Sequence, residues 1–245
     1  MLNENKLNQR MVFLMESGFF GVLKESDDPE EVFDSKEVEK LKSFIESGQE
    51  DNFTLAFDII EGRGMNKEVF LNKYYGEGFI DLFKLAGFKF SPENIVKLLG
   101  IKDINFAYNN IYSLPESIGI LIHLRTLWLN GNNLTTLPES IGKLTNLKKL
   151  NLRGNQLTTL PDSIGNLTNL EYLTLESNQL TTLPDSIGKL QNLETLNLEG
   201  NQLTILPDSI SNLQNLRSLQ LELNSFSSEE KMELKNKLNY CKIYF

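Results

Sequence analysis

Apolar and polar residues alternate in the same way six times in the second half of the chain. Each segment follows the pattern LxxLxL, in which L is an apolar residue and the last two apolar residues are separated by one residue. Alternation with a period of two places the apolar side chains on one face of an extended strand and leaves the other face free. The pattern therefore predicts six short β-strand segments, which begin at Ile101, Leu124, Leu147, Leu170, Leu193 and Leu216.

Prolines repeat with the same period outside these strands. Six of the seven prolines stand 23 residues apart, from Pro92 to Pro207, and the pattern between them is LxxLxLxxNxLTTLPxSIGxLxN. A repeat this regular predicts a solenoid, because each strand buries its apolar face only when the next repeat stacks on it at about 4.8 Å. The side chains expected in the core include Leu127, Leu129, Leu150 and Leu152.

The remaining positions of the repeat have physical reasons of their own. An asparagine follows each strand, and an inward amide there can bond turn groups that no strand ladder reaches. The Leu-Pro pair then starts the return path, where Ile118 and Leu121 and their copies add core contacts one short helical turn apart. The repeat asparagines are Asn109, Asn132, Asn155, Asn178, Asn201 and Asn224.

This 23-residue pattern resembles the leucine-rich-repeat family. Segments 137–141 (Leu-Pro-Glu-Ser-Ile) and 160–164 (Leu-Pro-Asp-Ser-Ile) are similar to the LPxxIxxLxxL repeats of Ras-binding scaffolds, and the near-identical LTTLPDSIG copies look most like spirochaete-type bacterial proteins. The resemblance covers residues 91–245. It implies an α/β fold, a right-handed solenoid whose concave side carries a parallel β-sheet that usually binds proteins.

The chain before the repeats has a different composition, with 12 of the 15 phenylalanines at or before Phe90. We expect helices there: one capped by Ser35, with Val38, Leu41, Phe44 and Ile45 on one face, then 53–60, 68–75 and 79–85. The predicted domains are a helical N-terminal capping domain at 1–90, the solenoid at 91–224, and a C-terminal cap at 225–245. In that cap, Ser227 and Glu230 form a capping-box pattern, and residues 241–245 alternate like a strand.

Charge and composition limit the classes of partner that the chain can bind. The formal net charge of −9 repels a phosphate backbone, so we predict no nucleic-acid partner. No apolar run approaches the ~18 residues of a membrane span, so we predict no membrane insertion. The stretch 11–15 is interrupted by Glu16 and reads as a first helix rather than a signal peptide. Cytoplasmic location is the default expectation, and export by a non-classical route stays open.

No constellation of catalytic residues is evident, and we predict neither enzymatic activity nor a cofactor or metal. His123 is the single histidine and occupies a turn position that holds asparagine in later repeats. Cys241, the single cysteine, is expected to be buried in the last strand. The glycine-rich segment 62–67 lacks P-loop spacing and is expected to be a turn between helices. The acidic run from Asp27 to Asp34 lacks calcium-loop spacing.

The free face of the sheet is the candidate binding surface. Its outward residues are basic on the first three strands and acidic on the next three, with Trp128 and Tyr172 on the same face and Tyr108 near its rim. Exposed aromatic residues are favoured interface anchors. The candidate binding residues are Lys102, Asn105, Arg125, Trp128, Lys148, Lys149, Asn151, Arg153, Tyr172, Thr174, Glu176, Glu194, Asn197 and Glu199.

The sequence therefore predicts a module that binds another protein through this face. One alternative is an exported adhesin or effector that binds host macromolecules. A further alternative is a small-molecule sensor or enzyme that uses the helical domain. The opposite charges of the two ends also allow two copies to face each other antiparallel, although we expect a different protein as the partner.

Overall fold

The computed structural model describes residues 32–47, 49–75, 78–87 and 91–245. The chain divides into two compact units, Met1–Leu98 and Leu99–Phe245. The first helix expected near residues 11–15 and most of the acidic run that starts at Asp27 lie outside the described residues. Each unit is described by itself below.

The described part of the first unit is helical, as the sequence predicts. Helix α3 packs against α4, α4 against α5, and α5 against α6. Helix α3 is capped by Asp34 rather than by Ser35, because the Asp34 carboxylate accepts the backbone N–H groups of Lys36 and Glu37 at 2.9 Å each. The helices are α3 (Ser35–Ile45), α4 (Glu50–Gly62), α5 (Lys67–Tyr75), α6 (Phe79–Leu85) and α7 (Pro92–Leu99).

Two sets of polar contacts join three of these helices. The Arg63 guanidinium lies 2.7 Å from the Glu37 carboxylate, donates to the Val32 carbonyl at 3.0 Å, and sits 5.1 Å from the Phe33 ring centroid. The Tyr75 hydroxyl donates to Glu46 at 2.8 Å, and burial together with that carboxylate raises the Tyr75 pKa. These contacts tie the ends of α4 and α5 to α3.

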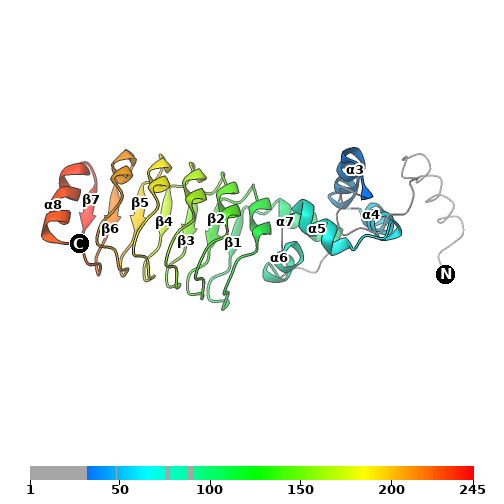
Figure 1. The fold of residues 1–245 in the computed structure, drawn as a ribbon, viewed down its shortest axis with the longest axis horizontal. Helices are drawn as coiled ribbons and strands as arrows, with labels where there is room; N and C mark the ends of the chain where they lie inside the picture. Colours follow the sequence, from blue (N-terminus) through cyan, green and yellow to red (C-terminus); the bar gives the residue numbers. More distant parts are fainter. Residues whose placement is uncertain (1–31, 48, 76–77, 88–90) are drawn as a thin grey trace, which may run out of the picture. The chain divides into compact units, whose positions relative to one another are not determined.

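The second unit is built on one seven-stranded parallel sheet in which the strands follow chain order (Figure 1). Strands β1 to β6 are registered with one another at an offset of 23 residues, so Leu127 lies beside Leu150 and Leu150 beside Leu173, whereas β6 and β7 are offset by 24. These leucines are fully buried, as the alternation predicts. The strands are β1 (Asp103–Asn105), β2 (Thr126–Trp128), β3 (Lys149–Asn151), β4 (Tyr172–Thr174), β5 (Thr195–Asn197), β6 (Ser218–Gln220) and β7 (Lys242–Tyr244).

The predicted helical turns of the return path are 3₁₀-helices that stack on one another. They are η1 (Glu116–Ile120), η2 (Glu139–Lys143), η3 (Asp162–Asn166), η4 (Asp185–Lys189) and η5 (Asp208–Asn212). A Cβ at Gly142 would stand 2.5 Å from the backbone oxygen of Ser163 in the next repeat. Glycine is therefore required where another repeat follows, and the last repeat, which has none after it, carries Ser211 instead.

The repeat asparagines form an internal ladder of hydrogen bonds. The Asn155 side chain accepts the N–H of Leu134 at 3.1 Å and donates to the carbonyls of Leu129 and Leu152 at 3.0 and 2.9 Å. The amides of 132, 178, 201 and 224 bond in the same way. This confirms the predicted role of the asparagine. Asn109 differs from the prediction: it is exposed and donates to the Ala107 carbonyl of its own turn.

A helix and a short strand follow the last repeat. Ser227 accepts the N–H of Glu230 at 3.1 Å and opens helix α8 (Ser228–Lys237), after which β7 pairs with β6. The Lys237 ammonium lies 2.6 Å from Asp208 in η5, which lowers the Asp208 pKa and fastens α8 to the last repeat. The backbone edge of β6 is therefore covered by β7. An uncovered edge would expose N–H and C=O groups that can pair with another chain and cause aggregation.

Candidate functional site: the open face of the sheet

The sheet of the second unit buries one face in the core and leaves the other open. We call the open side the sheet face and define it by the outward residues of β1–β6 and the exposed or partly exposed residues within two positions of the strand ends. All fourteen candidate residues lie on it. Seven are exposed: Lys102, Asn105, Arg125, Trp128, Lys148, Lys149 and Arg153. Six are partly exposed: Asn151, Tyr172, Glu176, Glu194, Asn197 and Glu199.

Thr174 is the one candidate that offers almost no surface. It lies on β4 in register with Asn151 and Asn197, but only 3% of it is exposed. Its position on the outward face is as predicted from the alternation. The strand pattern alone does not describe this burial.

Trp128 is the largest apolar side chain on the sheet face and is 37% exposed. Its strand neighbours Leu127 and Leu129 are fully buried, so the backbone of β2 holds the indole outward. In register it lies between Asn105 on β1 and Asn151 on β3. A large, partly exposed ring on a rigid strand loses little conformational entropy when a partner covers it.

Tyr108 extends the aromatic surface to the rim of the first repeat. It is 77% exposed and adopts a left-handed backbone conformation with φ of 57°. A Cβ at Gly131 would collide with the Tyr108 ring, so the glycine of the second repeat makes room for it. A left-handed backbone conformation at a non-glycine residue lowers the stability of the fold, and such strained positions cluster at functional sites.

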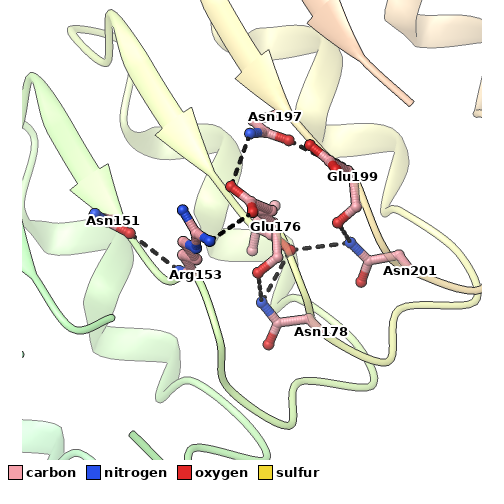
Figure 2. Close-up of polar contacts among 8 residues, drawn as sticks. Asn151, Arg153, Glu176, Asn178, Asn197, Glu199 and Asn201 are labelled. Carbon is pink, nitrogen blue, oxygen red and sulfur yellow. Dashed lines mark hydrogen bonds and ion pairs between the residues drawn. The ribbon is translucent and has the colours of Figure 1, made fainter. Parts of the chain in front are cut away.

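Ion pairs between neighbouring repeats occupy the middle of the sheet face. Lys148 lies 2.6 Å from Glu171, and Arg153 lies 3.1 Å from Glu176. Figure 2 shows Arg153 and the Asn197 amide converging on Glu176, whose side chain is only 16% exposed. The partners of each ion pair are 23 residues apart. The repeat period could therefore have predicted these ion pairs, which the strand alternation does not indicate.

The ion pairs change the expected bipolar charge pattern. The cations at its centre are compensated, whereas Lys102, Arg125 and Lys149 have no ion pair within the described part of the chain. Toward the other end, Glu194 pairs with Arg217 at 3.5 Å. Over β1–β6, uncompensated positive charge is therefore confined to β1–β3; beyond them, exposed Lys242 on β7 has no ion pair among the described residues.

The other residues weighed from the sequence lie apart from this face. His123 is exposed in a turn, as predicted, and residues 63–66 join α4 to α5, as predicted for the glycine-rich segment. Cys241 lies just before β7 and is only partly buried, so the expectation of a buried cysteine in the last strand is wrong. Its partial burial still raises the pKa of its thiol to about 11. It is therefore protonated and weakly nucleophilic at neutral pH.

Metal-ligand clusters and membrane-spanning helices are both missing from the described residues. Over 32–47, 49–75, 78–87 and 91–245, no three His, Cys, Asp or Glu side chains are grouped to hold a metal ion. Within the same ranges no helix is long and apolar enough to cross a bilayer. A groove in the helical unit is lined by Phe33, Asp34, Ser35, Val38, Glu39 and Tyr74. Its two carboxylates have structural tasks, since Asp34 caps α3 and Glu39 lies 3.4 Å from Lys42.

Comparison with known proteins identifies the class of protein that this fold defines. The family model described as a leucine-rich repeat region matches residues 87–175 and 164–235. The chain belongs to the leucine-rich-repeat family. Members of this family generally mediate protein–protein interaction and are typically binding modules without enzymatic activity.

The first of two similar solved structures supports this assignment. A leucine-rich-repeat protein of Leptospira interrogans is 40% identical with a TM-score of 0.60, over 64% of this chain and 40% of that one. The chain thus spans less than half the length of this spirochaete protein. The ectodomain of the Arabidopsis thaliana receptor kinase GASSHO1/SCHENGEN3, solved with CASPARIAN STRIP INTEGRITY FACTOR 2, is 36% identical over 52% of this chain and 16% of that one, with a TM-score of 0.49. No curated protein matches the sequence.

Proposed function

We propose that this chain is a protein-binding module and that the sheet face is its contact surface. The observation that carries the proposal is Trp128, the single tryptophan of the chain, held 37% exposed between buried leucines on a rigid strand. Burying an indole in an interface is among the largest single contributions to protein association. The interaction role of the leucine-rich-repeat family supports the same function.

A different protein fits this face better than a second copy of the chain. An antiparallel pair of copies would set Lys148 and Arg153 against Glu176 and Glu199 of the other copy. Lys148 and Arg153 already pair with Glu171 and Glu176 of their own chain at 2.6 and 3.1 Å. Self-association would have to break or share these pairs, and an exposed ion pair contributes only ~0.2–1 kcal/mol in return.

The proposal is tested by comparing the partner affinity of two variants. Each lacks one exposed aromatic ring, on the sheet face in one variant and away from it in the other. Immobilised protein captures a partner, which is identified by photo-crosslinking from position 126, the other outward position of β2, so that Trp128 stays intact. The partner is then titrated against purified variants. Trp128→Ala should weaken binding by roughly thirtyfold, the effect of losing ~2 kcal/mol at an interface anchor. Its melting curve should stay close to that of the wild type, because the ring lies outside the core.

Tyr112→Ala is the matched control. Tyr112 is a 73% exposed aromatic residue in the turn region after β1, away from the strands. Its removal should leave both affinity and melting unchanged. Equal binding by wild type, Trp128→Ala and Tyr112→Ala would show that the sheet face is not the contact surface.

A further inference from the structure

The first three strands of the sheet face carry positive charge that the chain itself does not neutralise. Lys102, Arg125 and Lys149 are exposed, and no side-chain partner of theirs occurs among the described residues. Asp103 is the acid nearest to them along the strands, in register with Thr126. Three cations against one anion leave this part of the surface positive within a chain whose formal net charge is −9.

Two amides beside Trp128 add donors to this positive surface. The Asn105 oxygen accepts the N–H of Ala107 at 3.0 Å, and the Asn151 oxygen accepts the N–H of Arg153 at 3.1 Å. Both amides thus have their acceptor atoms engaged and keep N–H donors to offer. Because Asn105 and Asn151 flank Trp128 in register, the indole is bordered by donors on both sides.

The opposite end of the sheet face has the reverse character. The Gln220 side-chain oxygen and one Glu222 carboxylate oxygen are buried without a donor in the described part of the chain. Glu199 has no ion pair there either. The buried Gln220 and Glu222 oxygens have no exposed surface and cannot contact a partner. The sheet face therefore changes from donors and cations at β1–β3 to the uncompensated carboxylate of Glu199 beside β5.

We propose that β1–β3 bind a short acidic segment of a partner protein. An apolar side chain of that segment covers Trp128, and its carboxylates lie against Lys102, Arg125 and Lys149. Two inter-strand steps of about 4.8 Å span ~10 Å, which an extended segment of about three residues covers at ~3.3 Å per residue. This inference rests on the proposed function, because it assigns the partner chemistry of the same face.

A long polyanion such as a nucleic acid fits this surface poorly. Beyond β3 it would meet five glutamates beside β4, β5 and β6. Glu171, Glu176 and Glu194 are paired with cations of neighbouring repeats, whereas Glu199 and Glu222 have no ion pair among the described residues. Repulsion there opposes a continuous row of phosphates, whereas a few carboxylates end before the acidic half begins. The charge reversal along the sheet thus favours a short acidic peptide.

Intrinsic fluorescence tests the proposal directly, because Trp128 is the only tryptophan and every change in tryptophan emission reports on this site. The probes are two tryptophan-free peptides, Gly-Glu-Leu-Asp-Glu-Gly and its charge-reversed counterpart Gly-Lys-Leu-Arg-Lys-Gly. The acidic peptide should shift the emission with an affinity that falls as salt rises. The basic peptide should leave the emission unchanged.

Lys149→Glu provides the residue-level test and Lys143→Glu its control, since Lys143 is an exposed lysine on η2 rather than on a strand. Lys149→Glu should weaken the acidic peptide about five- to tenfold, because one attraction is lost and one repulsion is added. Lys143→Glu should bind like the wild type. Equal response to both peptides, no response to either, or tighter binding of a single-stranded oligonucleotide would overturn the inference.

The two proposals fail in different ways. If a partner depends on Trp128 but tolerates Lys149→Glu and contacts the face with a neutral or basic segment, the proposed function stands and the acidic-segment inference is wrong. If no partner depends on Trp128, the sheet-face function itself is wrong.

Discussion

Replacing Asn155 with alanine tests the internal ladder that holds the repeats in register. The substitution leaves the N–H of Leu134 buried without its partner, which costs about 1–3 kcal/mol. The carbonyls of Leu129 and Leu152 each keep one donor, because Asn132 also bonds the first and Asn178 the second. The expected total loss of unfolding free energy is therefore about 2–3 kcal/mol. Most of it comes from the one buried N–H, that of Leu134, which is left without an acceptor.

The shared carbonyls predict how two such substitutions combine. Asn155→Ala with Asn178→Ala removes both donors from the Leu152 carbonyl. The double variant should cost about 1 kcal/mol more than the sum of the single variants. Asn155→Ala with Asn201→Ala is the matched control, because these two amides share no carbonyl and should be additive.

Thermal and urea unfolding measure these differences. A loss of ~2 kcal/mol lowers the melting temperature of a chain of this size by about 4–8 °C. Asn146→Ala is the surface control: its amide donates to the Ile122 carbonyl at 2.7 Å but is exposed, so water replaces it and the cost stays below ~1 kcal/mol. Equal melting of Asn155→Ala and Asn146→Ala, or strict additivity of both double variants, would refute the reasoning from shared carbonyls.

Two further predictions concern the stacking of repeats. Gly142→Ala should destabilise the protein by about 1–3 kcal/mol because the new Cβ meets the Ser163 backbone, whereas Ser211→Ala, at the same repeat position, should change stability by less than ~0.5 kcal/mol; similar urea midpoints for both would contradict this. Deleting residues 225–245 uncovers the β6 edge that β7 now pairs, so light scattering should show aggregation. A monodisperse product that unfolds cooperatively would show that the cap is dispensable.

Much of the second unit follows from the sequence because its structure is local and periodic. A strand with alternating leucines can bury them only in one pairing register, because a shift of one residue would turn every leucine toward solvent. The period of 23 then places equivalent residues of successive repeats side by side, as the pairing of Leu127 with Leu150 confirms. The helices of the first unit were predicted with nearly correct bounds, but the cap of α3 was misplaced by one residue, from Asp34 to Ser35.

The candidate site was predicted less completely, since exposure and pairing depend on side chains from neighbouring repeats. The alternation placed Trp128 and Thr174 on the same face, but only the packed structure shows one exposed and the other buried. It likewise gave no indication that Arg153 turns toward Glu176 while Lys149 is left unpaired. These outcomes depend on side-chain length and rotamer, which a pattern of residue types does not contain.

The sequence by itself therefore determined the family, the strand register and the asparagine ladder. Each of these follows from a residue type at a fixed spacing, because stacking converts a sequence period into a spatial one. The tertiary structure decided which charges of the sheet face cancel and which remain. That distinction requires distances between side chains, and it leaves the uncompensated cations beside Trp128 on β1–β3.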